Sequence, residues 1–166
     1  MEECIKREIG GREPEDVERL MLDQAKCNDQ LAHLAPFVNL VSLSMNDASI
    51  ASLNTMPVLD NLATLKLSDN KIKNGLDSLT KLSALEKLYL AGNQIPDIET
   101  LDPLKKLSKL EWLDLEGNPV TRVPGYADKI FEMLPALMVL DGKNRDGEEL
   151  QDEEDDDEVF YSVLCP

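Results

Sequence analysis

The sequence contains few of the residues on which most catalytic and metal sites depend. It has one histidine and three cysteines, and Cys4, Cys27 and Cys165 are far apart along the chain. An odd number of dispersed cysteines does not predict a disulfide framework or a zinc site, so we interpret them as free thiols of an intracellular, reducing compartment. His33 lies in the segment LAHLAPF, and we interpret it as a surface or packing residue. The sequence therefore predicts no metal and no cofactor.

Long apolar runs and catalytic motifs are also missing. No stretch of about 18 apolar residues occurs, so the sequence predicts no membrane span. The opening residues MEECIKREIGG do not have the apolar segment of a secretory signal. No nucleophile elbow, glycine-rich phosphate loop or calcium loop is present. These absences argue against an enzyme.

Positive charge is scarce. The chain has 17 Lys and Arg against 33 Asp and Glu, a net charge of −16. Phosphate binding requires clustered cations, so we do not expect direct binding of nucleic acid, whereas basic proteins are the electrostatic complement. Nine of the acids lie in residues 148–166, which contain no Lys or Arg. This segment predicts a solvated, disordered acidic tail, with its densest run at Asp152, Glu153, Glu154, Asp155, Asp156, Asp157 and Glu158.

Leucine at a fixed spacing is what the sequence has in abundance. Residues 85–95, LEKLYLAGNQI, follow the pattern L-x-x-L-x-L-x-x-N-x-L, and residues 62–72 and 110–120 repeat it. Weaker copies start at residues 17 and 40, with alanine in place of asparagine, and a truncated copy starts at residue 137. The copies begin 22 to 27 residues apart, which is the period of a leucine-rich repeat. The repeat asparagines are predicted to form a ladder of hydrogen bonds to turn backbone: Asn70, Asn93 and Asn118.

This pattern predicts an α/β leucine-rich repeat solenoid. We expect a curved parallel sheet on the concave side and short helices or 3-10 turns on the convex side. The predicted domain covers residues 1–147, with a capping helix over residues 2–10 and repeats starting near residues 17, 40, 62, 85 and 110. A C-terminal cap with an amphipathic helix is expected over residues 121–142. Order is expected to decline from Lys143 onward, and residues 148–166 form the tail.

The concave face of the sheet is the predicted binding site. Strand alternation turns the residues between the repeat leucines outward. Trp112 is the only tryptophan, and the alternation places it beside Tyr89. Aromatic and charged side chains on a rigid surface are typical of an interface hot spot, although a solvated face with mixed charges is the alternative. The predicted contact residues are Arg19, Ser44, Lys66, Lys87, Tyr89, Trp112, Asp114, Glu116 and Asp141.

Four segments resemble the acidic leucine-rich nuclear phosphoprotein 32 family. They are REPEDVERLMLD, LKLSDNKIKNGLDSL, LYLAGNQIPDIETLDPLKKL and YADKIFEMLPALMVLDG, in this order within residues 1–147. The resemblance implies a non-enzymatic adaptor of nucleus and cytoplasm, although no import signal is visible. Family members are linked to histone binding and chaperoning, inhibition of histone acetylation and of protein phosphatase 2A, and mRNA export. The acidic tail of this chain is much shorter than is usual in the family.

Three functional hypotheses result. The first is a monomeric adaptor that binds basic nuclear proteins, above all histones, through the concave face and the acidic tail. The second is a protein phosphatase inhibitor or regulator that acts through the concave face without the tail. The third is a structural subunit of a ribonucleoprotein particle, because residues 118–121 and 126–141 resemble the cap of the spliceosomal U2 small ribonucleoprotein A-prime subunit. The acidic tail argues against the third hypothesis.

Overall fold

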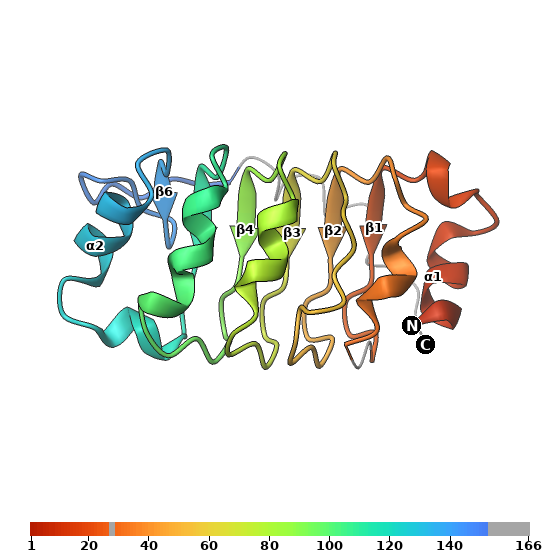
Figure 1. Ribbon diagram of the computed structural model, residues 1–166, viewed down its shortest axis with the longest axis horizontal. Coiled ribbons are helices and arrows are strands. Elements are labelled where there is room, and N and C mark those ends of the chain that lie inside the picture. Colours follow the sequence, from red (N-terminus) through yellow and green to blue (C-terminus); the bar gives the residue numbers. More distant parts are fainter. Residues whose placement is uncertain (27–28, 153–166) are drawn as a thin grey trace.

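Six short parallel strands form one open sheet (Figure 1). The structure is a computed structural model and describes residues 1–26 and 29–152. The strands lie in the sheet in chain order, which is the arrangement that consecutive repeats predict. They are β1 (Arg19–Met21), β2 (Ser42–Ser44), β3 (Thr64–Lys66), β4 (Lys87–Tyr89), β5 (Trp112–Asp114) and β6 (Val139–Leu140).

Most of the helical segments lie on one side of this sheet, in front of the strands in Figure 1, and the N-terminal helix lies at the end of the sheet beside β1. We call the opposite surface of the sheet the sheet face. The segments are α1 (Glu2–Ile9), η1 (Pro14–Asp16), η2 (Leu31–Leu34), η3 (Leu76–Lys81), η4 (Glu99–Lys106), η5 (Pro119–Arg122) and α2 (Tyr126–Met133). The predicted leucine-rich repeat solenoid, with strands on one side and mainly 3-10 turns on the other, is thus confirmed.

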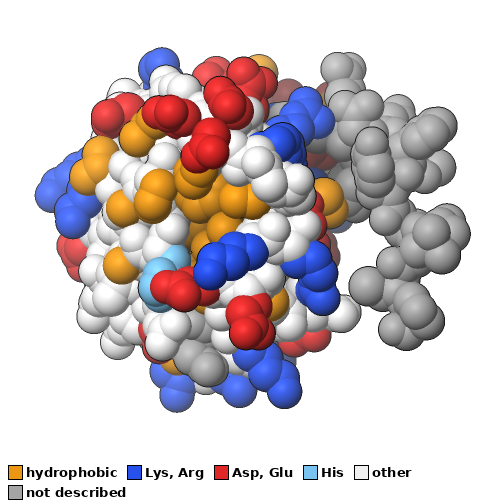
Figure 2. All heavy atoms as spheres, turned by 90° about the vertical axis from the view of Figure 1, so that its right-hand side faces the viewer, with side chains coloured by type: hydrophobic (Ala, Val, Ile, Leu, Met, Phe, Trp, Pro, Cys, Tyr) orange, Lys and Arg blue, Asp and Glu red, His pale blue; other side chains and the backbone are white. Residues whose placement is uncertain are grey.

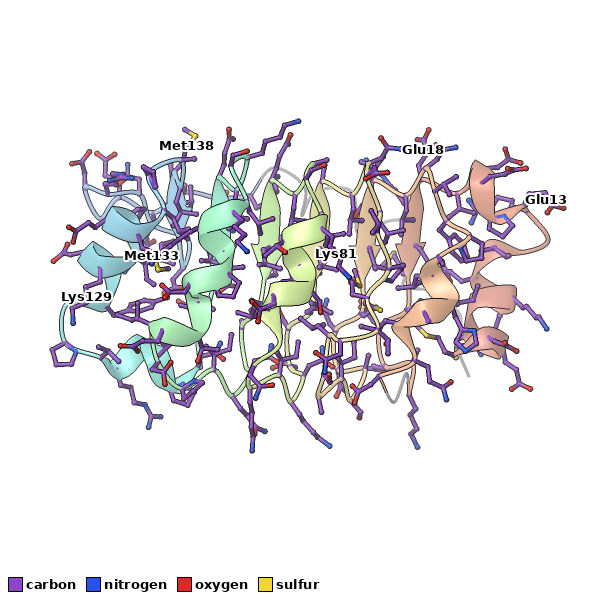
Figure 3. The ribbon with its side chains drawn as sticks, viewed as in Figure 1. Glu13, Glu18, Lys81, Lys129, Met133 and Met138 are labelled. Atoms are coloured by element: carbon purple, nitrogen blue, oxygen red, sulfur yellow. The ribbon has the colours of Figure 1, made fainter. Side chains whose placement is uncertain are left out.

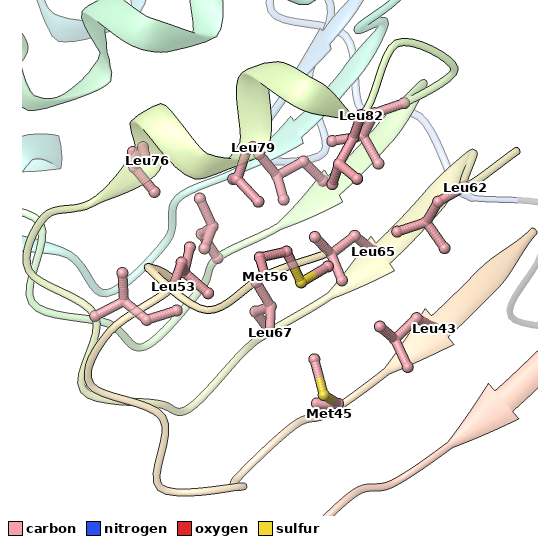
Figure 4. Packing of buried hydrophobic residues seen from close by; sticks show 14 of the residues in the cluster. Leu43, Met45, Leu53, Met56, Leu62, Leu65, Leu67, Leu76, Leu79 and Leu82 are labelled. Atoms are coloured by element: carbon pink, nitrogen blue, oxygen red, sulfur yellow. The ribbon is translucent and has the colours of Figure 1, made fainter. Parts of the chain in front are cut away.

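The core lies between the sheet and the helical side, and leucine fills it. Each three-residue strand turns its middle leucine inward, and Leu65 and Leu88 are completely buried. In Figure 4, Leu76, Leu79 and Leu82 lie over the strand that carries Leu65, and all four belong to one buried cluster. Full burial of a leucine side chain contributes about 1.5–3 kcal/mol relative to exposure. Stacked repeats therefore supply the core that a single repeat lacks.

Parallel register stacks equivalent repeat positions in rows across the sheet. Residues two apart in a strand point to the same face, so the first and third strand positions form the rows of the sheet face. The first row pairs Arg19, Ser42, Thr64, Lys87, Trp112 and Val139. The third-position row pairs Met21, Ser44, Lys66, Tyr89 and Asp114. The spacing of the repeats predicts these two rows.

The predicted asparagine ladder is present. The Asn93 side chain accepts a hydrogen bond from the Ile72 N–H (3.0 Å) and donates to the carbonyls of Leu67 and Leu90 (2.9 Å each). Asn70 also donates to the Leu67 carbonyl, and Asn118 also donates to the Leu90 carbonyl. Adjacent asparagines therefore share an acceptor, and the ladder connects three repeats.

Both ends of the described solenoid are covered by helices. At the N-terminal end Ile5 of α1 is buried against the first repeat, and α1 ends at Gly10 with a left-handed φ of 58°. At the C-terminal end α2 buries Ile130 and Phe131. The amphipathic helix predicted for the C-terminal cap is therefore present.

The expected decline of order at Lys143 is wrong for residues 143–152. Lys143 forms antiparallel bridges with Leu140 and Glu149, and the Leu150 N–H donates to the Gly142 carbonyl (2.8 Å). The Arg145 guanidinium donates to the Phe131 and Pro135 carbonyls and lies 5.0 Å from the centre of the Phe131 ring. These contacts hold a segment whose composition alone favours solvation. Cys27, Cys165 and the predicted disorder of the tail from residue 153 lie outside the described residues.

Candidate binding face of the sheet

An aromatic pair occupies the sheet face where β4 and β5 lie side by side. The ring centres of Tyr89 and Trp112 are 6.5 Å apart, and the rings are tilted by 34°. The Lys66 ammonium lies 5.5 Å from the centre of the Tyr89 ring. Both distances are within the range of favourable aromatic and cation–π contacts. Both aromatic residues are half-buried rather than freely exposed.

The cations of the sheet face lie on β1, β3 and β4. They are Arg19, Lys66 and Lys87. The Lys87 ammonium contacts a carboxylate oxygen of Asp152 at 2.6 Å. The Asp152 side chain is only 5% exposed, and that of Lys87 is 25% exposed. This ion pair joins Asp152, the last residue that the structure describes, to β4 in the middle of the sheet.

Carboxylates occupy the opposite end of the sheet face, where β5 and β6 end. Asp141 Oδ1 accepts a hydrogen bond from the Leu115 N–H (2.7 Å), and Asp114 Oδ1 accepts from the Glu116 N–H (3.0 Å). Burial raises the pKa of Asp114. Burial also raises the pKa of Asp141 to about 6, and the charges of Asp114 and Glu116 add to this effect. The site therefore holds closely spaced, partly desolvated negative charge.

Tyr126 is buried close to this carboxylate cluster, and no sequence pattern indicates that it belongs to the site. Its hydroxyl is buried near Asp141 without a hydrogen bond of regular geometry. Burial raises the pKa of the Tyr126 hydroxyl, and the negative charge of Asp141 raises it further. The hydroxyl is therefore protonated and turned towards a desolvated carboxylate.

Asp141 is expected to lower stability at neutral pH. Its pKa in the folded protein, about 6, lies above the ordinary value of 3.8, so the unfolded chain ionises first as the pH rises. Stability therefore falls between about pH 4 and pH 6 and stays lower above this window. Asp141→Asn keeps an acceptor for Leu115 and removes the charge. We expect it to raise the free energy of unfolding at pH 7 by about 1–2 kcal/mol, after solvent screening is allowed for.

Urea denaturation at pH 4 and pH 7 tests this expectation. The gain of Asp141→Asn should disappear at pH 4, where the carboxyl is protonated in both states. Asp128→Asn, on the exposed side of α2, is the matched control. A variant that is less stable than the parent at pH 7 would contradict the assignment.

The structure brings together most of the predicted contact residues, but Ser44 differs from the others. Its side chain is buried, and its hydroxyl donates to Asp23 Oδ1 (2.7 Å). The same carboxylate oxygen accepts from the Asn46 N–H (2.7 Å). Ser44 therefore belongs to a local network between β1 and β2, and we do not include it in the proposed contact surface.

A hollow at the N-terminal end lies apart from this surface. Figure 2 shows apolar side chains at this end with acidic and basic groups around them. Met1, Cys4, Met21 and His33 are among the residues that line the hollow. His33 Nδ1 lies 3.3 Å from Glu2 of α1, in keeping with a packing residue. Residues 1–26 and 29–152 contain no cluster of side chains suited to a metal and no helix long and apolar enough to cross a membrane.

Comparison with known proteins identifies the same repeat. A family model described as a leucine-rich repeat matches residues 35–163. Acidic leucine-rich nuclear phosphoprotein 32 family member A of Drosophila pseudoobscura pseudoobscura is 41% identical over 156 residues, and the protein of that name in Drosophila melanogaster is equally similar. These matches cover 94% of this chain and 59% and 60% of the two relatives, so the chain spans about three fifths of their length.

Solved structures share the fold. A chain of the Drosophila melanogaster SNF/U2A' complex matches with 26% identity and a TM-score of 0.58, over 71% of this chain and 66% of that chain. An internalin of Listeria monocytogenes matches with a TM-score of 0.60 at 22% identity, over 83% of this chain and 47% of that chain, and shows the fold alone. The chain belongs to the leucine-rich repeat family, and its predicted resemblance to the acidic leucine-rich nuclear phosphoprotein 32 family is confirmed.

Proposed function

We propose that this protein is a non-enzymatic adaptor whose sheet face binds a basic segment of a nuclear protein, with histones as the first candidates. One observation carries the proposal: an aromatic pair lies next to a cluster of partly desolvated carboxylates on a rigid sheet. Relatives named nuclear phosphoproteins support a nuclear partner.

The chemistry of this surface suits lysine or arginine side chains. A cation beside Asp114 and Asp141 gains attraction and offsets the loss of hydration by which burial raises the pKa values of both carboxyls. A guanidinium can also stack on Trp112 while it donates hydrogen bonds to a carboxylate. The sheet holds these groups in place before binding, so little conformational entropy is lost there.

The acidic tail has a second part in this proposal. Residues 153–158 are six consecutive acids, and such a run attracts basic proteins over a distance set by salt. This distance is about 8 Å at physiological ionic strength and about 3 Å at 1 M. Tail-assisted binding should therefore be fast and strongly salt-dependent, whereas contacts on the sheet face should depend less on salt.

Titration of core histones at increasing salt, with two full-length proteins, tests this division. One is the parent chain, and in the other each acid of residues 153–158 is replaced by its amide. We expect the parent to lose affinity steeply with salt and the amide variant to bind more weakly with a flatter dependence. Salt-insensitive binding by the parent, or the same slope in both proteins, would contradict the role of the tail. A matched control neutralises six exposed acids of the helical side: Asp60, Asp77, Glu99, Asp102, Asp128 and Glu132.

A subunit role in a ribonucleoprotein particle is the second candidate. The similarity to a chain of the SNF/U2A' complex, at 26% identity, favours it. The sequence pattern of the cap in residues 118–121 and 126–141 points in the same direction. Under this hypothesis the partner is a protein of an RNA-bound complex, and binding does not require the acidic tail. The amide variant therefore separates the two candidates in a pull-down from nuclear extract.

A further inference from the structure

The two edges of the sheet differ in how their backbone is paired. At the C-terminal edge the Leu140 N–H of β6 donates to the Lys143 carbonyl (2.8 Å), and Lys143 forms a bridge with Glu149. The chain itself therefore covers β6. At the N-terminal edge β1 pairs with β2, and the helix α1 lies beside it in Figure 1. An edge strand is a template on which a further strand can form hydrogen bonds.

The N–H groups along β1 and just after it alternate in direction. Those of Leu22 and Gln24 donate to carbonyls of the neighbouring repeat (2.7 and 2.8 Å). Successive N–H groups of a strand point to opposite sides, so those of Met21 and Asp23 point away from β2. Within residues 1–26 and 29–152 neither of these two has a hydrogen-bond acceptor. Two outward donors two residues apart are what an added strand pairs with.

The hollow at the N-terminal end borders these donors. It lies between α1 and residues 21–26 and has a volume of about 820 Å³, which is within the usual range of about 300–1,000 Å³ for ligand sites. Three sulfur-containing side chains, Met1, Cys4 and Met21, are part of its lining, and Met21 is 46% exposed. Methionine adapts its shape to a partner, and its sulfur makes favourable contacts with aromatic rings. The hollow therefore suits an aromatic side chain.

The charges around the hollow distinguish between two kinds of occupant. Four acids line it, three of them on α1, against the two cations Arg7 and Lys26. A second copy of this chain would bring the same excess of acids and a net charge of −16, which opposes association. A segment rich in lysine or arginine is attracted by the same charges. The edge is therefore suited to a basic segment of a different protein.

We propose that the outer edge of β1 binds an extended basic segment of a partner protein by strand addition, with one aromatic side chain in the hollow. The N–H groups of Met21 and Asp23 donate to carbonyls of this segment. Its side chains alternate between two faces, so the aromatic residue enters the hollow while neighbouring lysines or arginines stay in solvent near the acids. The site lies at the opposite end of the sheet from Trp112, and it goes beyond the function proposed above.

Amide hydrogen exchange of the full-length protein, followed by NMR, tests the edge directly. We expect the N–H groups of Met21 and Asp23 to exchange roughly 100-fold faster than those of Leu22 and Gln24, which are hydrogen-bonded to the next repeat. The probe is the peptide KVKFKVK with blocked ends. At saturation it should slow the exchange of Met21 and Asp23 by about 10-fold or more. Slow exchange of both groups in the free protein, or failure of the peptide to slow them, would overturn the proposal.

Met21→Pro removes the outward N–H and no hydrogen bond to β2, because proline is tolerated where its nitrogen faces away from the sheet. We expect it to bind the peptide about 10-fold more weakly than the parent, which corresponds to about 1.4 kcal/mol. Met21→Leu, which keeps the N–H and nearly the same volume, is the matched control. Equal affinity of the folded Met21→Pro variant and the parent would overturn the proposal. A peptide methylated at alternate backbone nitrogens repeats the test on the unchanged protein and should also bind more weakly.

Two further peptides test the chemistry of the segment. Replacement of its phenylalanine by serine, or of its lysines by glutamates, should each weaken binding about 10-fold, and equal affinity of all three peptides would overturn the assignment. Sedimentation of the parent protein tests the other occupant. We expect a monomer, and a dimer that Met21→Pro dissociates would assign the edge to a second copy instead. These measurements do not involve the sheet face, so their failure leaves the adaptor function standing.

Discussion

Replacement of Asn93 by alanine is expected to lower the free energy of unfolding by about 2–4 kcal/mol. Asn93 is 4% exposed, and the hydrogen bonds of its side-chain amide connect neighbouring repeats. The Leu67 and Leu90 carbonyls keep a donor from a neighbouring asparagine. The loss therefore concentrates on the buried Ile72 N–H, to which alanine offers no acceptor. An unsatisfied buried polar group costs about 1–3 kcal/mol, and the lost packing of the amide adds to this.

Urea denaturation monitored by circular dichroism measures this loss. Asn74→Ala is the matched control, because Asn74 lies four residues after Asn70 in an exposed turn. Its effect should stay within about 0.5 kcal/mol, as for most surface substitutions. Equal effects for the two variants would contradict the role of the ladder as a stabilising element.

The sequence was sufficient to predict the sheet because the repeat period determines the register. Equivalent positions of consecutive repeats must stack, so the outward rows through Lys87 and Tyr89 follow from counting residues. The asparagine ladder follows in the same way, since Asn70, Asn93 and Asn118 occupy one position of the repeat. These predictions depend on local spacing alone.

One helical segment that the pattern predicts is missing from the described residues. Residues 51–61 form turns and no 3-10 helix, although Leu53, Met56 and Leu59 are buried at intervals of three. The Met56 N–H donates to the Leu53 carbonyl (2.9 Å), which makes a single turn. Pro57 has no N–H with which to continue it. Apolar spacing thus predicts which residues are buried more reliably than it predicts the hydrogen bonds of the backbone.

The sequence alone does not predict the contact between Lys87 and Asp152. The two residues are 65 positions apart, and a run of acids after a glycine-containing loop is typical of a solvated tail. What places Asp152 on the sheet is the tertiary position of Lys87, together with the turn in which Leu150 pairs with Gly142. Trp112, which the strand alternation turns outward, is half-buried and packs against Tyr89.

Replacement of Trp112 by alanine is expected to weaken binding of core histones about 10- to 30-fold, or by about 1.4–2 kcal/mol. The indole is the largest side chain of the sheet face, and it packs against Tyr89 beside the carboxylates of Asp114 and Asp141. It points away from the leucine core, so the stability of the fold should change little. Met138→Ala is the matched control, because Met138 is 60% exposed and lies in Figure 3 at the edge of the sheet rather than on its face.

Titration of core histones into the parent, Trp112→Ala and Met138→Ala proteins at physiological salt tests the central claim most directly. The claim that the sheet face binds the partner predicts the loss for Trp112→Ala alone, with all three proteins folded. Equal affinity of the folded Trp112→Ala variant and the parent would contradict it.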